Sequence, residues 1–345
     1  MRLLFIKPKH IGDTLLLTPT LVAARHAYPE AEIWVLVRRG CESILAGCPE
    51  IDRVLLVAAV DACGRTLQDA VCQAATLARL ACTRFDYIFE LGDGHRARLF
   101  ARAARTSHRY SVRPDSPLRG GAARAFTGVS TFNWETCHRV EKDYRSVAEF
   151  LPLPSEIPPL RFDRALTRAW PAAAELRDFA VMQIGTRQAF NRWGLEDWRA
   201  VCAYLLTRVD SVVIGTGTAP DEIAEAEALR EAFGSRVLCT RGEADWSQMA
   251  DLYYRARLYV GPATAAMHLA AACACPIVVL FGRTIEEHWH PWRTSYRAVN
   301  TVDTSSISDP EDRYRLIKAK TMRDTSSTNV IAACEALLSA PTTLR

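Results

Sequence analysis

The sequence lacks any apolar run near the roughly 18–20 consecutive residues that a transmembrane helix needs. Its first apolar run, LLFI, leads directly into Lys7 and is too short for the core of a signal peptide. We therefore expect a chain without a membrane-spanning segment that stays in the cytoplasm. With 345 residues, of which 49% are hydrophobic, the chain is long and apolar enough for two globular domains.

Cysteine pairs of the C-x-x-C type are also missing, although the chain has 11 cysteines. A scattered, odd set without a secretory signal predicts reduced thiols, most of them small core residues. The closest pair, Cys273 and Cys275, lies in an apolar stretch and does not by itself predict a metal site. We expect no bound metal and no cofactor.

Two further absences narrow the function. The net charge is only +4, and no basic segment carries interleaved aromatic residues, which argues against a nucleic-acid partner. This mild charge is compatible with an anionic substrate or a membrane surface. The first expected strand is not followed by G-x-G-x-x-G, and GTGTAP at Gly215 has the wrong spacing, so a nicotinamide-dependent oxidoreductase is disfavoured.

Short apolar runs alternate with helical patterns in both halves of the chain. The expected strands are RLLFIK, EIWVLVR, IDRVLLV and DYIFELG, then FAVMQIG, DSVVIGTG, RVLCT, RLYVG and PIVVLFG. The helical stretches between them include DTLLLTPTLVAARHAYP, which we expect to form one helix. This alternation predicts an α/β protein with two doubly wound parallel sheets.

Proline-rich PLPSEIPPLRF is the best candidate for a linker between two domains. We expect an N-terminal domain over residues 1–160 and a C-terminal domain over 161–325. Residues 326–345 should form a helix that packs back on the N-terminal domain. Two such domains are expected to face a central cleft, where the carboxyl ends of the strands bind ligands.

The stretch KPKHIGDTLLLTP places Gly12 and Asp13 where the first expected strand passes into a helix. Glycine permits a tight turn that would point Asp13 toward a ligand. A carboxylate here is either the N-cap of the helix, which needs only an oxygen acceptor, or a functional group. The residues alone leave both interpretations open.

A second joint lies in YVGPATAAMHLAAAC, where a strand ends at Gly261 and Thr264 stands near the start of an Ala-rich helix. Small side chains let a ligand approach the backbone, and the N-terminus of a helix offers unpaired N–H groups with a partial positive charge. The pattern predicts a phosphate site. The alternative is a plain strand–helix connection capped by Thr264.

Four segments together resemble glycosyltransferase family 9, which contains the ADP-heptose:lipopolysaccharide heptosyltransferases. They are IKPKHIGDTLLLTPTLVAARHAYP, CHRVEKDYRSVAEFLPL, GPATAAMHLAAACACPIVVLFGRT and STNVIAACEALL, and in this order they cover nearly the whole chain. The resemblance implies a GT-B fold, in which two Rossmann-like domains hold a nucleotide-sugar donor mainly through the C-terminal one. It also implies an inverting reaction that needs no metal.

By this resemblance, Asp13 matches the general base of the family. Such a carboxylate would take the proton of the acceptor hydroxyl as it attacks the anomeric carbon, typically worth about 10²–10⁴ in rate. Lys7, His10 and Gly12 fall on the acceptor side. For Lys7 and His10, plain surface exposure is the alternative.

On the donor side, Ala263, Thr264, Ala265 and His268 fall where the family holds the diphosphate and the sugar, and Thr186 is a further residue expected to bind the donor. Glu222 matches a carboxylate that binds the ribose. The alternatives are that His268 is a packed core residue and that Glu222 is solvated on a helix face.

The sequence also departs from the family. Ala263 stands where the family usually has Asp, Ala265 where Gly is frequent, and Asn191 where a Lys is usual. The replacement cation is expected from three arginines near Thr186 or after the Leu-Phe-Gly strand end, namely Arg187, Arg192 and Arg283. These departures leave the donor sugar open.

We therefore expect an inverting, metal-independent glycosyltransferase that moves a heptose-like sugar, with ADP-heptose the favoured donor, to a lipopolysaccharide core or related surface glycan. A lipid-linked acceptor would bring the enzyme to the cytoplasmic face of the inner membrane. The basic loop over residues 112–133, with Arg113, Arg119 and Arg124, would meet anionic groups there, or would be a solvated lid. The other readings are a catalytically silent nucleotide-sugar-binding protein and a transferase with a non-heptose donor.

Overall fold

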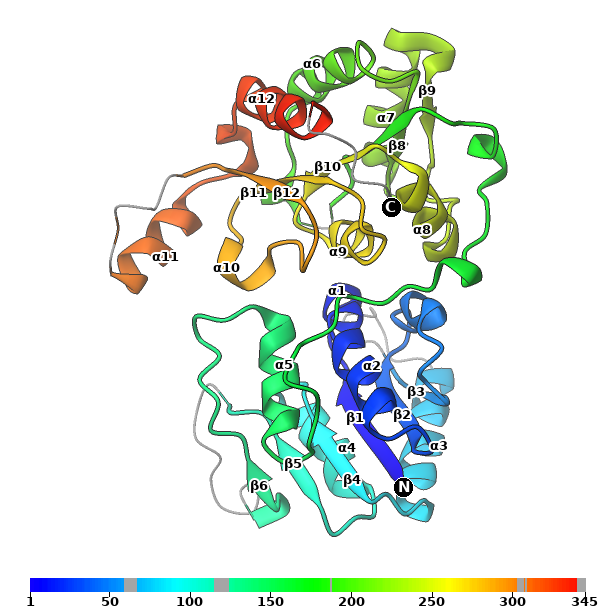
Figure 1. Ribbon diagram of the computed structural model, residues 1–345, viewed down its shortest axis with the longest axis vertical. Helices are drawn as coiled ribbons and strands as arrows, with labels where there is room; N and C mark the ends of the chain where they lie inside the picture. Colours follow the sequence, from blue (N-terminus) through cyan, green and yellow to red (C-terminus); the bar gives the residue numbers. More distant parts are fainter. Residues whose placement is uncertain (59–66, 115–123, 187, 303–306, 308, 340–345) are drawn as a thin grey trace. The chain divides into compact units, whose positions relative to one another are not determined.

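The computed structural model describes residues 1–58, 67–114, 124–186, 188–302, 307 and 309–339. The chain divides into two compact units, Met1–Asp163 and Arg164–Arg345, close to the boundary predicted between residues 160 and 161. Each unit carries one parallel sheet with helices beside it (Figure 1). No helix in the described ranges is both long and apolar enough to cross a membrane.

The N-terminal unit is built on a sheet of six described strands in the order β3-β2-β1-β4-β5-β6. The strands are β1 (Arg2–Lys7), β2 (Glu32–Arg38), β3 (Arg53–Val57), β4 (Tyr87–Glu90), β5 (Arg109–Ser111) and β6 (Gly128–Val129). The helices are α1 (Ile11–Leu15), α2 (Thr18–Ala27), α3 (Leu67–Cys82), α4 (His95–Ala103) and α5 (Arg139–Ala148), with a 3₁₀ helix η1 (Glu42–Gly47).

The C-terminal unit has a sheet of the same kind, in the order β12-β11-β10-β7-β8-β9. Its strands are β7 (Phe179–Gln183), β8 (Ser211–Gly215), β9 (Val237–Cys239), β10 (Leu258–Pro262), β11 (Ile277–Phe281) and β12 (Tyr296–Asn300). Its α-helices are α6 (Leu195–Leu205), α7 (Pro220–Phe233), α8 (Trp246–Arg255), α9 (Ala265–Ala272), α10 (Glu286–Trp289), α11 (Pro310–Ala319) and α12 (Ser327–Leu338).

Both sheets reverse their strand order at one place. In the first sheet β1 pairs with β2 on one side and with β4 on the other, and in the second sheet β7 pairs with β8 and β10. The doubly wound architecture is thus confirmed twice over. In open α/β sheets, ligands bind outside the carboxyl ends of the strands at this switch point. A ligand is therefore expected at the ends of β1 and β4, and at those of β7 and β10.

The first helical stretch is two helices rather than the single one predicted. Pro19 has no N–H group to donate to the carbonyl of Leu15, as a continuous helix would require. The hydroxyl of Thr18 donates to that carbonyl instead, at 2.8 Å. The proline therefore ends α1 early and leaves Asp13 on a helix of only five residues.

Three of the described strands were not predicted from the sequence, namely β5, β6 and β12. Each is short or carries few buried residues, and β6 and β12 lie at sheet edges. Backbone pairing holds such strands without an apolar run. Strand β6 also lies within residues 112–133, which were expected to form a loop or lid, so the part described there contributes to the sheet.

The packing of the C-terminal helix differs from the prediction. Helix α12 was expected to pack on the N-terminal domain, but its contacts are with α6, β10, β11 and β12 of the C-terminal unit. Val330 and Cys334 are fully buried in the core of that unit. Because apolar periodicity shows which face of a helix is buried but not against what, the sequence could not decide between the two domains.

We expect Val330→Ala to lower the free energy of unfolding by about 1–3 kcal/mol, because it removes two buried methyl groups and leaves a cavity. Thr328→Ala, at an exposed position of the same helix, is the control and should change it by less than about 0.5 kcal/mol. Urea unfolding measures both. Equal effects of the two substitutions would contradict the burial of α12 in this core.

Candidate active site

The joint between β1 and α1 holds four of the predicted residues. Strand β1 ends at Lys7, and α1 begins at Ile11 with His10 as its N-cap residue. Asp13 is the third residue of α1 and is partly exposed. It is therefore not the helix cap, and Gly12 lies inside the helix rather than in a tight turn. No hydrogen bond from the described residues occupies the Asp13 carboxylate, which leaves it available to a ligand.

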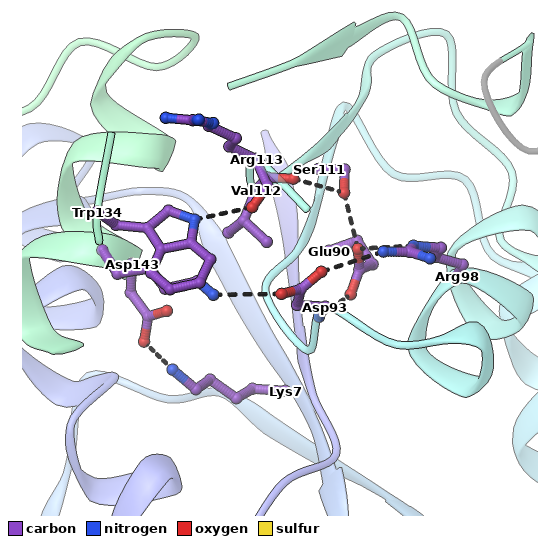
Figure 2. Close-up of polar contacts among 10 residues, drawn as sticks. Lys7, Glu90, Asp93, Arg98, Ser111, Val112, Arg113, Trp134 and Asp143 are labelled. Atoms are coloured by element: carbon purple, nitrogen blue, oxygen red, sulfur yellow. Dashed lines mark hydrogen bonds and ion pairs between the residues drawn. The ribbon is translucent and has the colours of Figure 1, made fainter. Parts of the chain in front are cut away.

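Lys7 is not a surface lysine. Only 3% of the residue is exposed, and its ammonium forms an ion pair with the fully buried Asp143 of α5 (Figure 2). Burial raises the pKa of Asp143, the charge of Lys7 opposes that shift, and the negative charge of Asp13 adds to it. Asp13 thus interacts electrostatically with the Lys7–Asp143 pair. His10, by contrast, is exposed, and its Nδ1 lies 3.4 Å from a guanidinium nitrogen of Arg38.

The neighbouring residue of α5, Lys142, points to a different carboxylate. Its ammonium lies 3.4 Å from Asp93, in the turn after β4, and 3.4 Å from the centroid of the Trp134 ring. The indole N–H of Trp134 donates to the carbonyl of Arg113 at 2.8 Å (Figure 2). Burial lowers the pKa of Lys142 to about 8, although the charge of Asp93 favours the protonated form.

Asp93 itself has a backbone angle φ of +50°, which is uncommon for a residue with a side chain. Its N–H donates to the carboxylate of Glu90, the fully buried last residue of β4, at 2.8 Å. Ser111 donates to the same carboxylate at 2.8 Å, and Arg98 pairs with Asp93 at 3.0 Å. Burial raises the pKa of Glu90 despite these partners. The carboxyl edge of this sheet thus carries a connected set of buried charges (Figure 2).

In the C-terminal unit, Glu222 of α7 is buried at the ends of two strands. Its carboxylate accepts hydrogen bonds from the N–H of Thr186, after β7, at 2.9 Å and from that of Gly217, after β8, at 2.8 Å. A Cβ atom at Gly185 would come within 2.5 Å of this carboxylate, so a larger residue there would displace the Glu222 side chain. Glu222 is thus not the solvated helix-face residue that the sequence left open. It connects the loops after β7 and β8, of which the loop after β7 lies at the switch point.

The predicted phosphate turn follows β10. Thr264 is the N-cap residue of α9, but its side chain makes no capping hydrogen bond. Ala263 and Ala265 flank it, so small side chains surround the first N–H groups of the helix, which have no partner within it. His268, the fourth residue of α9, is buried, and its ring centroid lies 6.2 Å from that of Trp289 in α10.

The candidate cations have different surroundings. Arg192 forms an ion pair with Asp221 of α7, which lowers the pKa of that carboxyl through their hydrogen bond. Arg283 donates from its Nε to the carbonyl of Lys320 at 2.7 Å, and its guanidinium carbon lies 5.0 Å from the ring centroid of Phe190. Arg187 falls outside the described residues.

Asn191 occupies the place of the Lys usual in the family. It is 91% buried, and a side chain at Gly282 would meet its Oδ1 at 3.0 Å. Its amide therefore packs against backbone and does not replace a cation. Among the described residues, no group of three or more His, Cys, Asp or Glu side chains is arranged to hold a metal ion.

The sequence reasoning missed Lys142 and Asp143. A Lys-Asp pair inside a helix is usually solvated. Both residues lie in CHRVEKDYRSVAEFLPL, one of the four segments that resemble the family, but the resemblance gave neither of them a role. One signal was present, because Asp143 lies at the helical spacing that joins it to the apolar Val140, Tyr144 and Val147, which are all buried. A carboxylate on an apolar helix face predicts a buried partner.

The profile of glycosyltransferase family 9 (heptosyltransferase) matches residues 74–315. Lipopolysaccharide heptosyltransferase 3 of Escherichia coli is 25% identical over 343 residues, which cover 96% of this chain and 98% of that protein. The solved family 9 glycosyltransferase of Veillonella parvula has a TM-score of 0.79 at 18% identity, covering 98% of this chain and 97% of that one. E. coli heptosyltransferase WaaC with ADP has a TM-score of 0.78 at 18% identity, covering 98% and 100%. These structures share the GT-B fold that the sequence predicts.

We expect the stability of the protein to rise between about pH 8 and 10.5 by up to about 3 kcal/mol through Lys142. In this window the unfolded chain still binds the proton, at its ordinary pKa of 10.5, while the folded protein has released it at about 8. Urea unfolding at stepped pH measures the rise. Lys142→Met should abolish it, and Lys318→Met, at an exposed lysine, should not. Parallel curves for wild type and Lys142→Met would contradict the effect.

Proposed function

Because the chain belongs to glycosyltransferase family 9 (heptosyltransferase) and is therefore a glycosyltransferase, we propose that it moves a heptose-like sugar from a nucleotide-sugar donor to a lipopolysaccharide core or related surface glycan. The E. coli relative that spans nearly the whole chain is named for lipopolysaccharide heptosyl transfer, which supports this acceptor class. The proposed reaction inverts the anomeric carbon in a single displacement and uses no metal.

The observation that carries the mechanism is the Asp13 carboxylate, which accepts no hydrogen bond from the described residues and lies at the switch point of the N-terminal sheet. In a single displacement, the acceptor hydroxyl attacks the anomeric carbon on the face opposite the leaving nucleoside diphosphate. The hydroxyl must lose its proton as the new bond forms, and Asp13 is the proposed base.

The donor is proposed to bind at the switch point of the C-terminal sheet. The N–H groups at the start of α9 would receive the diphosphate, and the small side chains of Ala263 and Ala265 would let it approach. Each oxygen of Glu222 accepts one backbone hydrogen bond and retains a lone pair, so ribose hydroxyls could still donate to it.

Arg283 is the proposed cation for the leaving group. Its Nε donates a hydrogen bond to the carbonyl of Lys320, and stacking on Phe190 orients the guanidinium plane. The terminal N–H groups can therefore donate hydrogen bonds to phosphate oxygens. Fixed donors of this kind stabilise the charge that develops on the diphosphate. Arg192 is a weaker choice because its charge is already paired with Asp221.

ADP-linked heptose is the proposed donor, since the E. coli structural neighbour is a heptosyltransferase solved with ADP. A silent nucleotide-sugar-binding protein and a transferase with another sugar are the alternatives, and Ala263 and Asn191 are the residues that favour them. We also propose peripheral contact with the inner membrane face through the basic loop. In that loop Arg124 is exposed, Arg113 pairs with Glu135, and Arg119 lies outside the described residues.

Asp13→Asn should lower kcat by about 10²–10⁴ because the amide keeps the shape of the carboxylate but cannot take the proton. Binding of the donor, followed by thermal shift, should be unchanged. The assay uses ADP-linked heptose with lipopolysaccharide cores shortened one sugar at a time. Glu30→Gln, at an exposed carboxylate of the same domain, is the control and should keep wild-type activity. An active Asp13→Asn enzyme would refute the base.

A thermal-shift screen of ADP-, GDP-, UDP- and dTDP-linked sugars identifies the donor, because a bound donor stabilises the folded state by mass action. We expect ADP-linked heptose to raise the melting temperature most. A larger shift with another nucleotide sugar would reassign the donor. Binding without turnover on any shortened core would favour the silent binding protein over the enzyme.

A further inference from the structure

Two adjacent charged side chains of helix α5 contact the ends of two different strands of the N-terminal sheet. Asp143 forms its ion pair with Lys7, the last residue of β1. Lys142 forms its ion pair with Asp93, in the turn after β4. Since β1 and β4 are the strands on either side of the switch point, the two ion pairs connect both sides of that point to one helix.

Stability alone does not explain these charges. The four side chains are between 0% and 7% exposed. Ion pairs buried in this way are often no more stabilising than apolar residues of similar volume, because both partners lose their hydration. In addition, Oδ1 of Asp143 is buried and has no hydrogen-bond partner among the described residues. A pair selected only for stability would be expected to satisfy both carboxylate oxygens.

The Lys7–Asp143 pair is closely connected to Asp13. Only three residues separate Lys7 from α1, and the N–H of Lys9 donates back to the carbonyl of Lys7 at 2.9 Å, which makes the turn tight. On the far side of the turn, the N–H and hydroxyl of Thr14 donate to the carbonyl of His10 at 3.0 and 3.1 Å. A displacement of Lys7 would therefore be passed to the first turn of α1.

We propose that Asp143, through its buried ion pair with Lys7, is a positioning residue that sets the place and the charge environment of the Asp13 carboxylate. Lys142 assists by holding the β4 turn with the same helix. The charged groups that act on Asp143 are Lys7 of β1, Lys142 of α5 and Asp13 of α1. The proposal rests on the proposed function for its effect on turnover, but the coupling between Asp143 and Asp13 can be measured without turnover.

The first experiment replaces the ion pair by apolar residues of similar volume, in Lys7→Met/Asp143→Leu. If the ion pair has only a structural role, the double variant should have an unchanged or higher melting temperature and unchanged activity. If the pair positions Asp13, we expect the melting temperature to hold while kcat falls by about 10–100-fold, with KM for ADP-linked heptose unchanged. A folded double variant with wild-type kcat would overturn the proposal.

The second experiment follows carbodiimide labelling of the Asp13 carboxyl against pH by peptide mass spectrometry. Asp143→Asn removes a negative charge and leaves the Lys7 cation unbalanced, which favours the ionised form of Asp13. We expect the midpoint of labelling to move to lower pH by about 0.5–1 unit. Asp251→Asn, in the ion pair with Arg255 of the other domain, is the matched control and should leave the midpoint unchanged.

The two proposals can fail separately. An unchanged midpoint in folded Asp143→Asn would overturn the positioning role, whatever the activity of the protein. An active Asp13→Asn enzyme together with a shifted midpoint would refute the catalytic base and leave the coupling intact. If Asp143→Asn does not fold, the kcat of Lys7→Met/Asp143→Leu tests the positioning role instead, because the double variant leaves no buried charge unpaired.

Discussion

The reversal of strand order next to the first strand of each sheet is the constraint on which the rest of this protein depends. At that place the connections leave in opposite directions, so the carboxyl ends of β1 and β4, and of β7 and β10, are not covered by a crossing chain. The Lys7–Asp143 and Lys142–Asp93 ion pairs, Glu90 and Glu222 lie at or beside one of these two edges. The sheets supply rigid strand ends, and short turns after them carry the groups that a ligand would meet.

The two edges use different chemistry. The N-terminal edge contains charged side chains withdrawn from water, in which the buried carboxylates of Asp143, Asp93 and Glu90 each have a cation or a hydroxyl donor on a neighbouring element. The C-terminal edge exposes backbone instead, with glycines and alanines where side chains would obstruct, and one carboxylate, that of Glu222, that orders two loops. Side-chain charge suits proton transfer, and backbone amides suit a phosphate. This division agrees with an acceptor on one domain and a donor on the other.

The sequence predicted those parts that have a local signature. Strands such as β1 and β11 are continuous buried apolar runs. Asp13 was singled out by its place between a strand and a helix, and its proposed role came from the family resemblance. Strand β5 and the edge strands β6 and β12 have no such run, and Pro19 was the local signal for the break between α1 and α2. Asp143 could not be assigned, because its burial depends on where α5 packs and its partner is 136 residues away in the chain.

That separation has a consequence for synthesis. Strand β1 leaves the ribosome with its lysine already in place, but the carboxylate that neutralises it is made 136 residues later. At the usual 5–20 residues per second, this takes roughly 7–27 s. During this time burial of the ammonium without its partner would be costly, so we expect the final burial of Lys7 in the middle of the sheet to wait for α5. The N-terminal domain is therefore completed from its end, when α5 emerges and allows the first strand to become buried.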